Sequence, residues 1–217
     1  MDYINVLFTF ILATMYFIVV YLTNITTDSK LLKLYQLFGS TTHGILVSIC
    51  SYIDICIMVF YGNNLEDLSF LYNWHYFSLF YFFYDIYWCI YLKTSLYIYH
   101  HIACIICLVY ALLINKYTNL LSVVLFCGEI TAPLINIISL LKIYEQKNEL
   151  LFICFATSFV LMRFIITPIV IIYIYAHISS YDKYIFIIMG LALLGGSIIW
   201  AKGQYNYIKK KICYKLD

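Results

Sequence analysis

The sequence predicts an all-α, polytopic membrane protein with seven transmembrane helices. Of its 217 residues, 65% are hydrophobic and only 11% are charged, whereas about a quarter of the residues in an ordinary globular domain are charged. So few charges cannot cover a soluble surface, and a disordered chain would need low hydrophobicity and high net charge. The net charge of +2 gives no footprint for a polyanion, so nucleic acid is not expected as a partner.

The spans follow from segment length, because a transmembrane helix needs about 20 mostly apolar residues. The first apolar segment lacks the basic start and small-residue cleavage site of a signal peptide, so it is counted as a span. No repeat or linker divides the chain, which predicts one domain. The expected spans are 4–23, 38–61, 74–92, 97–114, 119–141, 150–176 and 184–201.

The lysines predict the orientation. Loops on one side, with the C-terminal tail, hold ten lysines, and loops on the other side hold only Lys116 and Lys183. The positive-inside rule therefore places the N-terminus in the lumen and the C-terminus in the cytosol. The sequon at Asn24 then faces the cytosol and is expected to stay unglycosylated. The ten are Lys30, Lys33, Lys93, Lys142, Lys147, Lys202, Lys209, Lys210, Lys211 and Lys215.

The cysteines give no reason to expect a metal or a cofactor. Seven of the eight lie inside apolar runs, where cysteine usually serves as a small packing residue. Cys104 and Cys107 have the spacing of half a metal site, but no second half accompanies them. The adjacent His100 and His101 are poorly placed to share an ion, because neighbours on a helix point about 100° apart.

Ionisable side chains inside spans are costly and usually line a cavity or pair with one another. At 1.5 Å per helical residue, five polar side chains from four spans fall about 5–10 Å from the expected cytosolic ends. Glu129 and Arg163 lie deeper, at about 18–20 Å. Asp54 lies farther along the face that carries His43, where a wet outer vestibule could hold it. The five are His43, Asp85, His100, His101 and Asn136.

Two interpretations stay open for these groups. Glu129 and Arg163 could form an ion pair that locks two helices, or Glu129 could be a catalytic carboxylate. The histidine pair could be packed and satisfied, or it could mark a polar functional cavity. In the second case one histidine faces the cavity and the other bonds to a flanking helix. A neutral imidazole there could act as a general base, oriented by Asp85 or Asn136.

Two prolines predict bends in the helices that carry the deeper pair. Pro133 lies one turn beyond Glu129, and Pro168 lies five residues after Arg163. Each proline lacks an N–H and so frees a backbone carbonyl, which must find a partner in protein or water. Fixed bends around a cavity, or plain packing, would both account for them.

The polar residues of the spans, taken in chain order, resemble the motifs of the TLC-domain family. This family groups ceramide synthases, translocating-chain-associating membrane proteins and lipid-homeostasis proteins. The resemblance covers about residues 33–212 and implies six helices around a central cavity open to the cytosol, with one additional N-terminal span. The expected divisions are therefore an N-terminal helix and loop at 1–32, the TLC domain at 33–212 and a tail at 213–217. The matching motifs are Ser40-Thr41-Thr42-His43, Tyr81 to Asp85, His100-His101, Glu129 to Asn136, Arg163 with Pro168, and Trp200 before a basic tail.

Function transfers less directly. Ceramide synthases follow the paired histidines with two aspartates, whereas the fifth span here has Glu129 and Asn136, the pattern of non-synthase members. The leading hypothesis is a protein that handles membrane lipids or acyl chains. If it is an enzyme, it would transfer an acyl group from acyl-CoA, with His100 or His101 as base and Asp85 assisting. His43, Glu129, Asn136 and Arg163 would then line the cavity or support it.

A rival hypothesis is a non-catalytic lipid sensor or cargo-binding membrane protein whose histidines complete a buried network. A receptor or transporter is less favoured, because the last span has no central lysine and the chain has no paired broken helices in two related halves. The family implies the endoplasmic reticulum or a related membrane. Twelve lysines against one arginine are typical of an AT-rich genome, and in a virus the membrane would be the host's.

Overall fold

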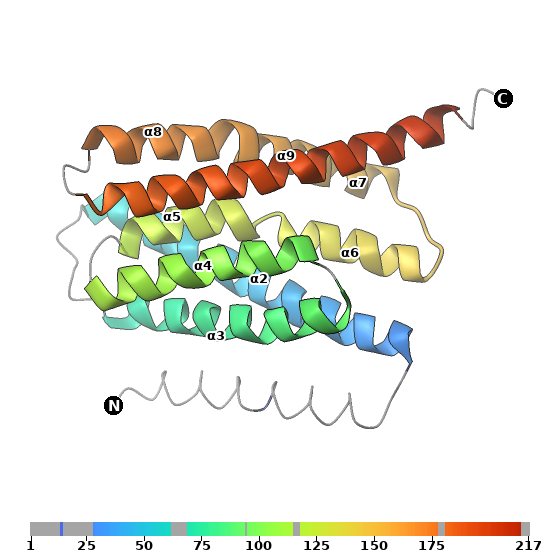
Figure 1. The fold of residues 1–217 in the computed structure, drawn as a ribbon, viewed down its shortest axis with the longest axis horizontal. Coiled ribbons are helices and arrows are strands. Elements are labelled where there is room, and N and C mark those ends of the chain that lie inside the picture. The colour runs from blue at the N-terminus through green and yellow to red at the C-terminus, as the bar shows by residue number, and fades with distance from the viewer. Residues whose placement is uncertain are drawn as a thin grey trace.

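The computed structural model describes residues 28–61, 69–93, 95–114, 118–177 and 181–213, together with Thr14. Within these ranges every regular element is a helix. The helices run side by side, with α8 and α9 along one edge of the view, α3 and α4 along the other, and α5 and α6 between them (Figure 1). The elements are α2 (Ser29–Tyr61), α3 (Ser69–Tyr91), α4 (Ser95–Ile114), α5 (Thr118–Glu129), α6 (Ala132–Ile143), α7 (Glu149–Val160), the π-helix η1 (Leu161–Ile166), α8 (Thr167–His177) and α9 (Lys183–Cys213).

Several helical segments in the described ranges are long and apolar enough to cross a membrane. They are Lys30–Phe60, Tyr97–Ile114, Leu120–Ile143, Glu149–His177 and Lys183–Lys202. Helix α3 has 23 residues but is not among these five. The expected span at 4–23 lies outside the described residues. The chain is thus an all-helical, multi-pass membrane protein, and the total of seven spans stays a prediction.

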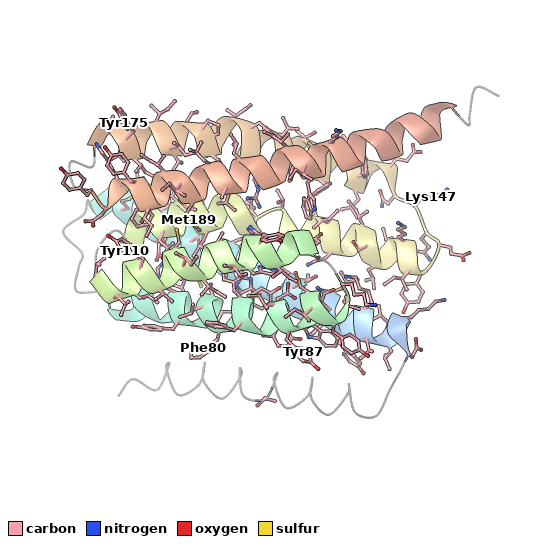
Figure 2. All side chains as sticks on the ribbon, in the orientation of Figure 1. Phe80, Tyr87, Tyr110, Lys147, Tyr175 and Met189 are labelled. Atoms are coloured by element: carbon pink, nitrogen blue, oxygen red, sulfur yellow. The ribbon has the colours of Figure 1, made fainter. Side chains whose placement is uncertain are left out.

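The outer surface of the bundle suits lipid. Phe60 and Leu113 are 78% and 80% exposed, and Phe80 and Tyr87 project outward from α3 (Figure 2). The interior holds a continuous apolar cluster in which Phe82 and Leu108 are completely buried. Large apolar side chains therefore occupy both faces of these helices, as expected where lipid replaces water.

Lysine-bearing segments gather at one end of the bundle. The start of α2, the α3–α4 turn and the α6–α7 connection lie together there (Figure 1), and Lys147 lies far from Tyr110 and Tyr175 (Figure 2). The prediction that Lys30 and Lys33 lie in a loop is wrong. Helix α2 already begins at Ser29, because Asp28 caps it and its Oδ1 accepts from the Lys30 amide at 2.8 Å.

Two irregular segments interrupt the long apolar helices. Helix α5 ends at Glu129 and α6 begins at Ala132, with a turn between them. This break lies where Pro133 cannot donate to the carbonyl four residues earlier. The second is η1, which precedes Pro168, and there the Thr167 hydroxyl donates to the Met162 carbonyl at 2.8 Å. Each predicted bend thus falls at a break in regular α-helix, and each break lies beside a charged residue of the interior.

Gly44 allows α2 and α6 to approach closely. A Cβ atom at this position would lie 3.0 Å from Pro133 Cδ and 3.2 Å from Ala132 Cβ. Contacts this short require a neighbour to move, and the proline ring is rigid. The glycine therefore sets the distance between the two helices that carry His43 and Asn136.

Replacing Gly44 by valine should destabilise the protein by about 1–3 kcal/mol, because the branched side chain must separate α2 from α6. Unfolding of the purified protein in detergent measures this. Gly195→Val is the matched control, because a Cβ atom at Gly195 meets no atom within 4 Å. Equal stability of the two variants would contradict the close packing at Gly44.

A buried polar cluster joins α2, α3 and α5 in the half of the bundle away from the lysine-rich end. Asp54 Oδ2 accepts from Trp74 Nε1 at 2.9 Å and from Ser122 Oγ at 2.6 Å. His75 Nε2 lies 3.3 Å from the same hydroxyl. Asp54 is only 3% exposed, so the expected wet vestibule is wrong. Donors from two neighbouring helices replace water at Oδ2, while Oδ1 is buried without a hydrogen-bond partner among the described residues.

Asp54→Leu should cost about 1–3 kcal/mol, because it leaves the buried Trp74 N–H without an acceptor. Asp54→Asn should cost less, since the amide oxygen can still accept that bond. Detergent-unfolding midpoints of the two variants test the ranking. A leucine variant as stable as the asparagine variant would show that the cluster does not hold these helices together.

Candidate functional site

A cavity of about 380 Å³ lies within the bundle, bordered by every described element except α8. Its volume is within the range of about 300–1,000 Å³ that is usual for small-molecule sites. Much of the wall is apolar, with Leu37, Ile135, Phe159, Leu193 and Trp200 among the lining residues. The polar side chains on it include Lys33, Gln36, Ser40, Asp85, His100, His101, Glu129, Asn136 and Arg163.

His101 and Asp85 form the tightest contact in this site. His101 Nε2 lies 2.7 Å from Asp85 Oδ2, and both side chains are about 95% buried. Gln36 Nε2 lies 3.4 Å from Asp85 Oδ1, and Lys33 Nζ donates to Gln36. The other ring nitrogen of His101 is buried and has no hydrogen-bond partner among the described residues. Asp85 therefore fixes the His101 ring, with Nε2 held by the carboxylate and Nδ1 buried.

His100 has the opposite setting. Its side chain is 25% exposed, and its Nε2 lies 3.9 Å from Glu129 Oε1. Because neighbours on a helix point about 100° apart, His101 turns toward α3 while His100 turns toward α5. The structure divides the two histidines as this angle predicts. His100 is thus the imidazole that a molecule in the cavity can reach, and Glu129, rather than Asp85, is the carboxylate beside it.

Glu129 lies between two histidines. Its Oε2 atom lies 3.5 Å from His43 Nδ1, on the side away from His100. His43 is 1% exposed and stacks on the Tyr81 ring, with 3.6 Å between the ring centroids. His43 is therefore behind the cavity wall and supports Glu129. The depth estimate that separated Glu129 from the histidine layer is wrong, because α5 ends at Glu129 and its side chain joins that layer.

The expected ion pair between Glu129 and Arg163 is absent from the described part of the chain, where no nitrogen and oxygen of the two lie within 4.0 Å. Arg163 Nη2 instead donates to the Gly128 carbonyl at 2.6 Å. The last four carbonyls of a helix have no partner within that helix, and α5 ends one residue later. The Arg163 guanidinium therefore supplies a hydrogen-bond donor to a free carbonyl at the end of α5. The Glu129 carboxylate lies beside His43 and His100 instead.

Asn136 joins two walls of the cavity. Its Nδ2 donates to Ser40 Oγ at 2.9 Å, which links α6 to α2. No hydrogen bond joins it to His100 or His101 among the described residues, and the groups beside those rings are Glu129 and Asp85.

Sequence reasoning missed Gln36 and placed Lys33 outside the membrane, although both line the cavity. A signal was present, because Lys33, Gln36, Ser40 and His43 are spaced three, four and three residues apart, which is one face of a helix. Starting the span at residue 38 hid this polar stripe.

Asp85, Cys89 and His101 place one potential metal-ligand atom each within 4.8 Å of one another. Two ligands of a tetrahedral zinc ion are about 3.3 Å apart, given metal distances of about 2.0–2.1 Å. The 2.7 Å between Asp85 and His101 is instead a hydrogen-bond distance. The arrangement is that of an oriented imidazole, and the expectation of no metal stays a prediction.

Comparison with known proteins agrees with this architecture. The family model described as the TLC domain matches residues 7–202. Searches of the curated proteins and of the solved structures give no match. The matched region contains all of the polar residues of the cavity, and it covers most of the chain. The protein therefore belongs to the TLC-domain family.

Proposed function

We propose that the cavity binds the acyl chain of a membrane lipid and that His100 acts as the base in acyl transfer from acyl-CoA. The observation that carries this proposal is a reachable imidazole, backed by the Glu129 carboxylate, on the wall of a mostly apolar cavity. An apolar wall with a few convergent polar groups is the usual form of a site for an amphipathic small molecule.

The chemistry needs one proton acceptor close to the reacting carbonyl. His100 takes the proton from an acceptor hydroxyl or amine, whose oxygen or nitrogen attacks the thioester carbonyl. The carbon–sulfur bond then breaks, and the proton is returned to the leaving thiolate. Glu129 stabilises the imidazolium that forms in between, since it lies 3.9 Å from Nε2. His101 and Asp85 are positioning residues in this scheme, because their contact leaves no accessible ring nitrogen.

Entry from the lysine-rich side suits a CoA substrate. Lys33 lines the cavity near that end of α2, and Lys93 and Lys147 lie in the connections there. Positive charge at the entrance of a site attracts phosphates. With that side in the cytosol, the protein would work in the endoplasmic reticulum or a related membrane, which in a viral infection would be the host's.

A second candidate is a lipid sensor or cargo-binding protein without turnover. It is favoured by the number of polar side chains that are already bonded within the protein, such as Asn136 with Ser40 and Asp85 with His101. A network of this kind also stabilises a bundle that only binds its ligand.

Replacing His100 by alanine should lower acyl transfer by about 10²–10⁴-fold while the fold is kept, because a base is lost from a partly open site. Incorporation of a labelled fatty acid into lipids of cells that express each variant measures this. His101→Ala is the comparison variant. Unlike His100→Ala, it should also lower the thermal stability of the protein, because it leaves the Asp85 carboxylate buried without its imidazole. An unchanged lipid profile in a folded His100 variant would leave the non-catalytic candidate.

Gly196→Leu should reduce the amount of acyl lipid that copurifies with the protein. Gly196 lines the cavity, and a Cβ atom there meets nothing within 4 Å, so a larger side chain fills the space without displacing a helix. Gly195→Leu adds the same volume on the neighbouring exposed position, which also has open space. Mass spectrometry of the bound lipids compares the pair. Equal lipid content would mean that acyl chains do not occupy the cavity.

A further inference from the structure

Arg163 is a cation for which the described residues supply few partners. It is the only arginine in the chain, it is 7% exposed, and it borders the cavity. It lies near the middle of the apolar segment Glu149–His177. A charge at this depth is costly and normally pairs with another protein group. The groups around Arg163 therefore indicate what kind of molecule the cavity binds.

The guanidinium uses few of its donors. Of the five N–H groups that an arginine carries, one bonds to the Gly128 carbonyl at 2.6 Å. No second hydrogen bond links it to the described residues, and its Nε is buried without a partner. Unmade hydrogen bonds of a buried cation are expensive. The described residues give this guanidinium one carbonyl acceptor, but no hydrogen-bonded anion.

The nearby carboxylates are engaged elsewhere. Glu129 approaches His43 and His100 at 3.5 and 3.9 Å, and Asp85 contacts His101 at 2.7 Å. Neither forms an ion pair with Arg163. Turning Glu129 toward the guanidinium would take the carboxylate away from the buried His43 and from His100. A negatively charged ligand would therefore supply the anion that the Arg163 guanidinium lacks among the described residues.

We infer that Arg163 recognises the carboxylate of a long-chain fatty acid whose tail occupies the cavity. A guanidinium presents a planar fork that matches a carboxylate with two parallel hydrogen bonds. The cavity of about 380 Å³ has room for one chain, and its walls are mostly apolar, so a single-chain lipid fits better than a phospholipid. The inference rests on the proposed function, since it requires an acyl chain in the same cavity, and it adds a free fatty acid, distinct from the thioester substrate, as a ligand that the site selects.

Binding of radiolabelled hexadecanoic acid and hexadecan-1-ol to the full-length protein in nanodiscs tests this inference. The two probes share their tail and differ in the head group. The wild type should bind the acid about 10–100-fold more tightly, as expected for hydrogen bonds between a charged donor and a charged acceptor. Arg163→Gln should remove this preference and leave the alcohol bound as before. Arg163→Lys should restore it only in part, because an ammonium keeps the charge but not the fork.

Two further variants locate the anion. Lys142→Gln removes one exposed charge away from the cavity and should change nothing. Lys33→Gln removes the other cationic side chain on the cavity wall and should leave the preference for the acid intact. Loss of the preference in the Lys33 variant but not in the Arg163 variant would overturn the inference. So would equal binding of both probes by the wild type.

The same measurements separate this inference from the proposed function. If neither probe binds the wild type, the cavity does not hold an acyl chain and both fail. If both probes bind equally, and Gly196→Leu weakens both, the acyl-chain site stands and only the carboxylate assignment fails. Thermal stability of the Arg163→Gln protein, checked in the same nanodiscs, shows whether its folded fraction matches the wild type. A folded variant that keeps the preference contradicts the inference directly.

Discussion

Glu129 is the residue on which the arrangement of the site depends, because a carboxylate inside an apolar bundle must be surrounded by donors from the protein. Two histidines from different helices meet it, one enclosed behind the wall and one open to the cavity. This contact ties α2 and α4 to the end of α5. It also gives His100 a carboxylate neighbour, without which the reachable imidazole would be an isolated polar group.

The helix irregularities are what bring these groups together. Pro133 stops α5 at Glu129, and the resulting helix end presents a carbonyl that Arg163 satisfies from η1. Gly44 then lets α6 approach α2 closely enough for Asn136 to reach Ser40. A straight fifth span would keep the Gly128 carbonyl in its own helical hydrogen bonds. In this fold the breaks in regular structure are therefore part of the site's construction.

The two buried polar layers of the bundle, around Asp54 and around His100, differ in how enclosed they are. Around Asp54, donors from two neighbouring helices close the space completely, so that layer holds helices together. Around His100, the same kind of residues leave a cavity beside a partly exposed ring. The Asp54 layer is enclosed, whereas the His100 layer borders a cavity, where polar groups keep hydrogen-bonding capacity for a ligand.

Much of the fold could be read from the sequence because it depends on composition and length. Hydropathy indicated a helical protein that spans a membrane, and it gave the approximate positions of the spans within the described residues. The resemblance in order and type of the polar residues indicated the family. The boundary of α2 was less accurate, since a capping aspartate and a polar helix face extend that helix beyond its apolar run.

The sequence by itself thus identified most of the ionisable side chains that the structure buries, because each interrupts an apolar run, but it missed Gln36 and placed Lys33 outside. Only the tertiary structure decided their partners. Residue counting assigned similar depths to Glu129 and Arg163, yet the carboxylate meets histidines and the guanidinium meets a carbonyl. Such a count follows one helix only and does not register where that helix breaks. Pairing depends on how helices rotate, tilt and end against one another, and hydropathy carries no record of those angles.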